Sequence, residues 1–287
     1  MKKLLTLTLL FLATSLLTPA LASAARSEKA GGPKSPPTTE PTEMVGYDIS
    51  YPQCGRRLPS DHYFAIIGVN GGLASNFNPC LSEQLQWAAT ARDGSNQAKV
   101  QLYVNTGNPA EEIDLYNWSN WPSSGTTPYG ECDGEKANTD ACSWQYGWDR
   151  SVETEAYFIK SAAEAGLLSS ATKDYTWWLD VETMNSWQNS SDDALKRNVA
   201  ALEGFAAYYQ SRGAHVGLYS TAYQWGEITG NFVSENSNLN GLDNWRPSGA
   251  SLANAKSNCN VDPLTSGGKI ALTQYVRKNL DHNYSCI

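Results

Sequence analysis

Short apolar runs alternate with amphipathic stretches along the chain from Val45 onward. The apolar runs are rich in Val, Ile, Leu, Tyr and Trp and are bounded by Gly, Asn, Asp or Ser, which is typical of buried strands. These runs cover residues 45–50, 63–72, 99–107, 175–182, 215–221, 241–247, 269–275 and 280–285. The stretches between them predict helices over residues 79–94, 151–166, 192–213 and 223–230.

Alternating strands and helices favour a parallel sheet with right-handed crossovers. Helices become scarce in the last third, so we expect a TIM-like α/β barrel whose outer layer of helices is incomplete. Residues 45–287 contain no internal linker and predict a single domain of this kind. In such barrels the chemistry lies at the carboxyl ends of the strands.

One segment interrupts the alternation. Residues 108–148 are rich in Gly, Asn, Ser, Trp and Pro, and a loop of this length is uncommon unless it has a function. We expect it to form the rim of a site, held by its own disulfide. Its tryptophans are candidates for stacking on sugar rings. They are Trp118, Trp121, Trp144 and Trp148.

The amino terminus predicts export. Lys2 and Lys3 precede an apolar stretch and a run of small residues, so residues 1–24 read as a signal peptide, cleaved after Ala22 or Ala24. Residues 25–44 are rich in Pro, Ser, Thr and Gly and predict a linker. We therefore expect a secreted protein, with no stable insertion into a membrane.

The net charge and the cysteine pattern limit which partners and cofactors we expect. The formal net charge of −8 argues against binding to nucleic acid. Six cysteines in an exported chain predict three disulfides, and although many pairings are possible, proximity in sequence favours three local ones. These are Cys54–Cys80, Cys132–Cys142 and Cys259–Cys286. No C-x-x-C is present and the three histidines lie far from the cysteines, so we expect no metal and no cofactor. We also expect a monomer.

Two acids end the strand-like run 175–182. Asp180 and Glu182 are two positions apart, so in a strand their side chains point to the same face. Ionised groups are costly at the end of a buried strand, and paired carboxyls are what acid-catalysed glycoside cleavage requires. A solvent-exposed strand end is the alternative explanation for such a short motif.

The order of motifs adds to this. G-Y-D-I-S at 46–50, L-D-V-E at 179–182, G-L-Y-S-T at 217–221, T-Q-Y at 273–275 and L-D-H-N at 280–283 resemble the glycoside hydrolase family 25 lysozymes. The resemblance implies an irregular (β/α)5(β)3 barrel and cleavage of the β-1,4 bond between N-acetylmuramic acid and N-acetylglucosamine. The run A-I-I-G-V-N-G-G departs from the family's K-A-T-E-G type of segment, which indicates a divergent secreted group.

The resemblance also implies roles for individual acids. Glu182 would be the proton donor and Asp180 its ionised neighbour, while Asp48 and Asp281 match the acids of the first strand and the closing motif. Five further residues near predicted strand ends, or on the same strand face as the acids, are candidates for substrate binding. They are Asn70, Asn105, Trp178, Tyr219 and Tyr275.

Two functions follow from these patterns. The first is a secreted hydrolase of peptidoglycan or a related amino-sugar polysaccharide, most simply a muramidase. The second is a non-catalytic glycan-binding or cell-surface barrel that retains the cleft. Retaining, inverting and substrate-assisted routes all remain open for the first.

Overall fold

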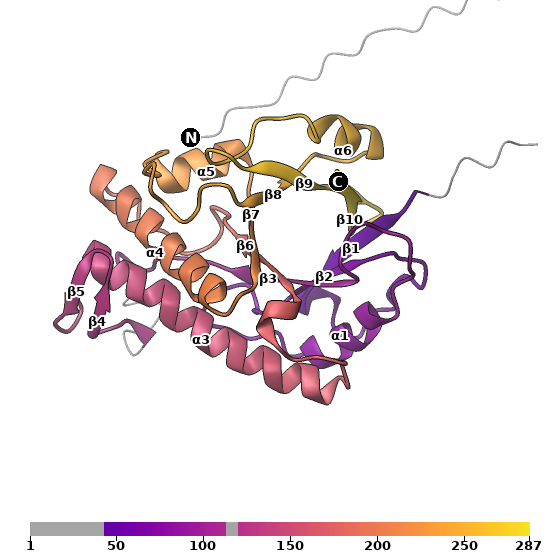
Figure 1. The fold of residues 1–287 in the computed structure, drawn as a ribbon, viewed down its shortest axis with the longest axis horizontal. Coiled ribbons are helices and arrows are strands. Elements are labelled where there is room, and N and C mark those ends of the chain that lie inside the picture. The colour runs from indigo at the N-terminus through magenta and orange to yellow at the C-terminus, as the bar shows by residue number, and fades with distance from the viewer. Residues whose placement is uncertain (1–42, 113–119) are drawn as a thin grey trace, which may run out of the picture. The chain divides into compact units, whose positions relative to one another are not determined.

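The computed structural model describes residues 43–112 and 120–287, and Glu43–Ile287 form one compact unit. Eight strands close into a barrel in the order β1-β10-β9-β8-β7-β6-β3-β2 (Figure 1). This confirms the predicted α/β barrel. The predicted signal peptide, and the linker as far as residue 42, lie outside the described residues.

The barrel strands coincide with the apolar runs of the sequence. They are β1 (Val45–Ile49), β2 (Ala65–Gly68), β3 (Val100–Asn105), β6 (Thr176–Asp180), β7 (His215–Tyr219), β8 (Asp243–Pro247), β9 (Lys269–Arg277) and β10 (Leu280–Ser285). Neighbouring strands are parallel except that β10 runs antiparallel to both β1 and β9. The start of β10 therefore lies level with the ends of the other strands.

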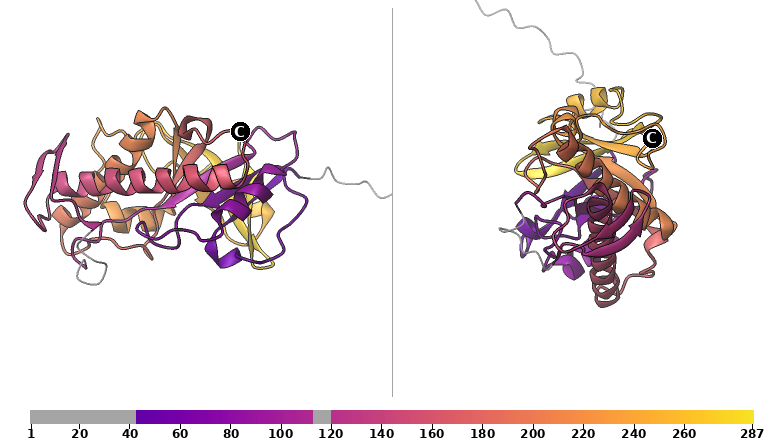
Figure 2. Two further views of the ribbon diagram at one scale, coloured as in Figure 1. Left: turned by 90° about the horizontal axis from the view of Figure 1, so that it is seen from below. Right: turned by 90° about the vertical axis from the view of Figure 1, so that its left-hand side faces the viewer.

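Helices pack on the outside of the barrel. They are α1 (Leu81–Ala89), α3 (Asp140–Glu164), α4 (Asp192–Ser211), α5 (Ala222–Thr229) and α6 (Leu252–Asn258), with short 3-10 turns η1 (Tyr51–Gln53) and η3 (Thr172–Asp174). A hairpin of β4 (Ser124–Thr127) and β5 (Gly130–Asp133) stands apart from the barrel. Figure 2 shows α3 as one straight helix across the outside of the barrel. Only η1 connects β1 to β2, so the outer layer is incomplete there.

The expectation of a loop over residues 108–148 was wrong for the hairpin β4–β5 and for residues 140–148, which belong to α3. The hairpin occupies its middle, and α3 starts at Asp140 because Thr139 Oγ1 accepts the backbone N–H of Cys142 at 3.1 Å. The small helix α6, capped in the same way by Ser251, was not predicted either. The N-cap residues of these two helices, Thr139 and Ser251, are present in the sequence, but the residues around them have the composition of loops.

Three tryptophans of that segment, Trp121, Trp144 and Trp148, pack against other aromatic rings and do not form a rim. Trp144 stacks on Trp148 at 5.3 Å, and Trp148 meets Tyr208 of α4 edge to face. Trp121 stacks on Tyr146 of α3. The helices α3 and α4 come close because each contributes a glycine at the crossing: a Cβ on Gly147 or Gly204 would lie about 2 Å from a carbonyl oxygen of the other helix. Trp118 lies outside the described residues.

Large side chains fill the interior of the barrel. Phe64, Ile66, Trp178, Trp245 and Leu272 form one buried cluster, separate from the core between sheet and helices. Glycines on neighbouring strands leave room for these rings, since a Cβ on Gly217 would lie 2.2 Å from the Trp178 ring. The barrel is thus a packed core with polar groups only towards its ends.

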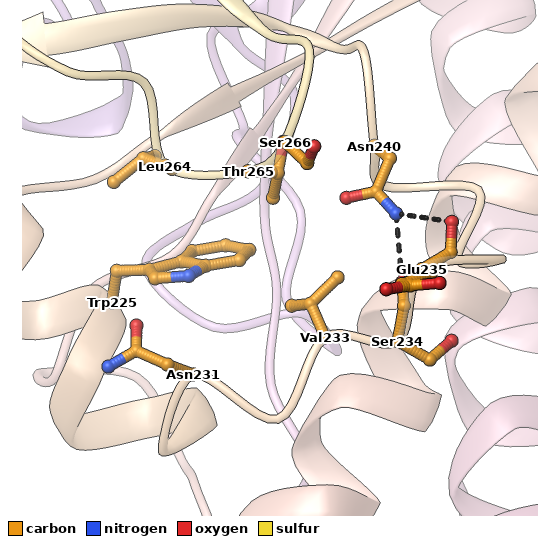
Figure 3. Close-up of a pocket in the computed structure, with 9 residues that line it drawn as sticks. All are labelled: Trp225, Asn231, Val233, Ser234, Glu235, Asn240, Leu264, Thr265 and Ser266. Carbon is orange, nitrogen blue, oxygen red and sulfur yellow. Dashed lines mark hydrogen bonds between the residues drawn. The ribbon is translucent and has the colours of Figure 1, made fainter.

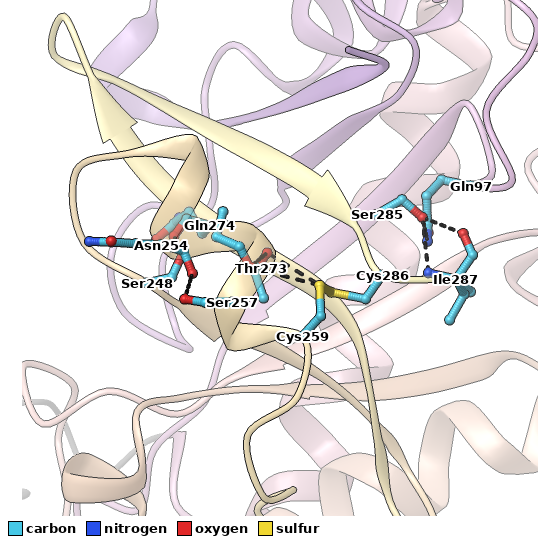
Figure 4. Close-up of a disulfide and its surroundings, with 11 residues drawn as sticks. Gln97, Ser248, Asn254, Ser257, Cys259, Thr273, Gln274, Ser285, Cys286 and Ile287 are labelled. Carbon is cyan, nitrogen blue, oxygen red and sulfur yellow. Dashed lines mark hydrogen bonds between the residues drawn. A yellow bond between two sulfur atoms is a disulfide. The ribbon is translucent and has the colours of Figure 1, made fainter.

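The three predicted disulfides are confirmed. Cys54–Cys80 joins the turn after η1 to the start of α1, and Cys132–Cys142 joins β5 to α3. Cys259–Cys286 ties the end of α6 to the residue after β10 (Figure 4). Within the described ranges, no helix is both long and apolar enough to cross a membrane.

Candidate active site

A cavity of about 260 Å³ opens at the carboxyl ends of the parallel strands. Every barrel strand except β2 contributes to its wall. Its lining residues are Asp48, Tyr103, Asp180, Glu182, Tyr219, Trp245, Gln274 and Asp281. The four acids selected from the sequence therefore meet in one place, although they come from β1, β6 and β10.

Strand direction explains how Asp281 reaches this cavity. Asp281 stands at the start of β10, but β10 runs against its neighbours, and Asp281 pairs directly with Asp48 near the end of β1. Residues directly opposite each other in an antiparallel pair have Cα atoms about 4.5–5.5 Å apart. Two carboxyl groups are thus held side by side by backbone pairing alone.

Asp180 ends β6 and Glu182 follows it, and hydrogen bonds hold the backbone at both positions. The carbonyl oxygen of Asp180 accepts hydrogen bonds from Thr106 Oγ1 at 2.6 Å and Asn185 Nδ2 at 3.1 Å. The carbonyl oxygen of Glu182 accepts one from Trp187 Nε1 at 2.9 Å. The loop after β6 is folded back by these bonds, so the positions of both acids are fixed without a helix to support them.

Among the described residues, side-chain amides contact the carboxyl groups of the cavity, and no Lys or Arg is in its lining. Asn105 Nδ2 donates to Asp180 Oδ2 at 2.6 Å, and a side-chain hydrogen bond joins Gln224 to Glu182. Asp180 is only 4% exposed, and its Oδ1 has no hydrogen-bond partner in the described part of the chain. One oxygen of a buried acid therefore lacks a hydrogen-bond partner among the described residues.

Burial and mutual repulsion favour protonation of the cluster. Burial, and then the charge of Asp281, raise the pKa of Asp48 to about 8. Burial, followed by the charges of Glu182 and Asp48, raises the pKa of Asp180 well above its usual range. Burial and Asp281 also raise the pKa of Glu182, which is more open to solvent. Burial raises the pKa of Asp281 as well.

The sequence analysis expected Asp180 to be ionised beside a protonated Glu182. In the structure, burial raises the pKa of both carboxyl groups, so their surroundings favour the protonated form at each of them. An ionised Asp180 requires a compensating charge, such as the one that develops on a sugar ring during cleavage.

The five predicted substrate-binding residues fall in different places. Tyr219 lines the cavity. Asn105 lies behind it and holds Asp180, and Asn70 Oδ1 in turn accepts the backbone N–H of Asn105 at 2.9 Å. Trp178 has the predicted inward direction, but it is 1% exposed and lies deeper in the barrel among the packed rings. Tyr275 stacks on His282 and does not line the cavity.

Three cavity residues were not among the sequence candidates: Tyr103, Trp245 and Gln274. Tyr103 stands two positions before Asn105, and so shares its strand face. Gln274 belongs to the T-Q-Y motif, where Tyr275 was chosen instead. Alternation along each strand could have identified both residues. Asn283, which donates to Asp48 at 2.7 Å, stood in the L-D-H-N motif but was not selected as a candidate.

A larger cavity, of about 470 Å³, lies elsewhere in the barrel domain (Figure 3). Its walls are Trp225 of α5, the segment before β8 and the segment before β9, so it lies towards the amino ends of these strands. Glu235 is the one acid in its lining. Among the described residues, no group of three or more His, Cys, Asp or Glu is arranged to hold a metal ion.

Comparisons with known proteins agree with the motifs. A family model described as Lysozyme-like protein 1 matches residues 147–254. Two proteins of Dictyostelium discoideum are similar in sequence. "Probable GH family 25 lysozyme 2" is 38% identical over 56 residues, which is 20% of this chain and 24% of that protein. "Probable GH family 25 lysozyme 4" is 33% identical over 113 residues, which is 36% of this chain and 50% of that protein.

Solved structures give weaker similarities. A muramidase from Trichobolus zukalii has a TM-score of 0.49 and 17% identity, with 84% of this chain and 93% of that chain covered. The modular Cpl-1 endolysin complexed with a peptidoglycan analogue has a TM-score of 0.46 and 12% identity, covering 85% and 54%. The sequence matches confirm the resemblance to family 25 lysozymes, and they span no more than half the length of the curated relatives.

Proposed function

We propose that this chain is a secreted glycan hydrolase, a muramidase that cleaves the β-1,4 bond between N-acetylmuramic acid and N-acetylglucosamine in peptidoglycan. The observation that carries the proposal is the cavity with four carboxyl groups at the carboxyl ends of the strands. The lysozyme-like sequence match over residues 147–254 supports it, because this range contains both Asp180 and Glu182.

Glu182 is the proton donor in this scheme. Its pKa is raised by burial and by the charge of Asp281, which favours the protonated form that a proton donor needs, and it is more open to solvent than Asp180. The proton passes to the glycosidic oxygen as the bond from that oxygen to the anomeric carbon breaks. The Glu182 carboxylate then takes a proton from the water that completes hydrolysis.

Asp180 fits an amino sugar in particular. Its Oδ1 is buried and unpartnered in the described structure. The 2-acetamido group of the substrate offers both an N–H donor and a C=O acceptor, so it can satisfy this oxygen whether Asp180 is ionised or protonated. Contact with the acetamido group also favours the substrate-assisted route, in which the acetamido oxygen attacks the anomeric carbon and Asp180 stabilises the positive charge that develops.

A direct test is turnover of purified peptidoglycan by the full-length secreted protein. We expect new reducing ends to accumulate in proportion to enzyme and time. Co-sedimentation with the same peptidoglycan, without release of reducing ends, would replace the hydrolase with the alternative, a glycan-binding barrel. Neither release nor co-sedimentation would remove peptidoglycan as the ligand.

Secretion is a separate part of the proposal. The first 24 residues support it, with the small residues around Ala22 and Ala24 as the cleavage region. Amino-terminal sequencing of protein recovered from the medium should begin at residue 23 or 25. Recovery of the chain only from cells, with Met1 retained, would contradict export.

A further inference from the structure

The carboxylate of Asp48 is held by two side-chain amides. Gln274 Nε2 lies 3.0 Å from Asp48 Oδ1 and 3.2 Å from Oδ2, and Asn283 Nδ2 lies 2.7 Å from Oδ2. All three residues are buried. Both amides present N–H groups to this acid, the arrangement that stabilises a carboxylate anion.

The oxygen of each amide accepts a hydrogen bond from an aromatic side chain. Trp245 Nε1 donates to Asn283 Oδ1 at 2.8 Å, and Tyr219 Oη donates to Gln274 Oε1 at 2.9 Å. An indole N–H can only donate, so Asn283 must turn its oxygen towards Trp245 and its NH2 group towards Asp48. A flipped amide would place N–H against N–H on one side and oxygen against carboxylate on the other.

We propose that Trp245 and Tyr219 are positioning residues: by hydrogen bonding to the amide oxygens of Asn283 and Gln274, they help to keep N–H donors on Asp48 and so set its readiness to ionise. Two relays, Trp245–Asn283 and Tyr219–Gln274, thus run from the packed interior of the barrel to one acid of the cavity. Their hydrogen bonds reach Asp48 through the amides.

The surroundings of Asp48 make these donors important. The titratable groups that face it are Asp281 on β10, Asp180 and Glu182 at the end of β6, Tyr103 on β3 and Tyr219 on β7. None of them is a cation, and no Lys or Arg is in the lining of the cavity. The amide N–H groups of Asn283 and Gln274 lower the pKa of Asp48 against its burial, and a backbone hydrogen bond at Asp48 itself lowers it further.

Trp245→Phe tests the first relay, and Trp178→Phe is its matched control. Both tryptophans are almost fully buried in the same cluster and both donate from Nε1 to a side-chain amide oxygen, at 2.8 Å and 2.7 Å. The acceptor of Trp178 is Gln101, for which no contact with a cavity acid is found in the described structure. The two variants lose equivalent groups, but only one loses a link to Asp48.

The readout is the pKa of Asp48, followed by 13C NMR of protein labelled at aspartate carboxyl carbons and assigned with Asp48→Asn. We expect Trp245→Phe to raise this pKa by about one unit, the scale of a weakened hydrogen bond to a charged group, and Trp178→Phe to leave it unchanged. An equal effect of the two variants, or none from Trp245→Phe, overturns the proposal. If Trp245→Phe does not fold, Tyr219→Phe removes a single hydroxyl group and should raise the same pKa.

The consequence for turnover rests on the proposed function. In a hydrolase, Trp245→Phe should move that part of the pH–rate profile which reports Asp48 to higher pH, and Trp178→Phe should not. If the parent protein releases no reducing ends from peptidoglycan, the proposed function fails, and the NMR titration still decides whether the relay exists.

Discussion

Two cavities of the barrel domain, the one with the four acids and the one beside Trp225, differ in how they are built. The smaller one, at the carboxyl ends, is lined by seven strands and holds four acids, each at a defined position of a β-ladder or next to one. The larger one, towards the amino ends of β8 and β9, is lined mainly by loops and by α5, and its one acid is Glu235. The larger volume of a cavity therefore does not identify the candidate active site here. The site is instead identified by the strand ends that bring several acids together.

Replacing one acid in each cavity should give the largest expected difference in turnover. Glu182→Gln should lower release of reducing ends from peptidoglycan by about 100-fold or more, the usual scale for losing a general acid, with binding and fold retained. Glu235→Gln, the matched control in the larger cavity, should keep the parent rate. Parent turnover in Glu182→Gln, or an equal loss in both variants, would refute the assignment of the proton donor.

The disulfide Cys259–Cys286 lies beside the strands that close the smaller cavity (Figure 4). Replacing both cysteines by alanine should lower the free energy of unfolding by about 3 kcal/mol, measured by denaturant titration. Turnover should fall at temperatures below unfolding, because β9 and β10 carry Gln274 and Asp281. The same change at Cys132–Cys142, which encloses a shorter loop, should cost less stability and leave turnover intact.

The buried carboxyl group of Asp48 should lower the stability of the folded protein as the pH rises. Its pKa of about 8 lies far above the ordinary 3.8, so the folded state keeps a proton that the unfolded chain has lost between these values, and stability falls as pH rises through that window. Asp48→Asn carries no charge, and at pH 8 it should be more stable than the parent by at least about 1 kcal/mol, or about 2–4 °C in melting temperature. The gain should disappear below pH 4. A melting temperature that is lower than the parent's at pH 8 would contradict the electrostatic account.

Asp281 should have a smaller, directional effect on the pH profile. Its charge helps to raise the pKa of Glu182, so Asp281→Asn lowers that pKa. Activity falls as the proton donor loses its proton, and this decline should therefore start at a lower pH in Asp281→Asn than in the parent. The pH dependence of kcat/KM on peptidoglycan measures it. A shift towards higher pH would show that Asp281 does not act on Glu182 through its charge.

The sequence by itself determined much of the architecture. Runs such as 99–107 and 175–182 have the composition of buried strands, and a strand is local, so their positions in the structure follow the pattern closely. Asp180 was identifiable because acids at the end of a buried strand are costly and stand out, and Asp48 was identifiable through the resemblance of its motif to family 25 lysozymes. The three disulfides join cysteines that are near in sequence, which is why proximity predicted them.

The tertiary structure alone decided the rest. Alternation gave Trp178 its inward direction but could not give its depth, because depth depends on which rings from other strands fill the barrel above and below it. Trp144 and Trp148 resembled loop residues until α4 supplied the surface on which they pack. The amide donors of Asp48 come from positions 274 and 283, over 220 residues away, and only closure of β9 and β10 onto β1 brings their N–H groups to that carboxylate.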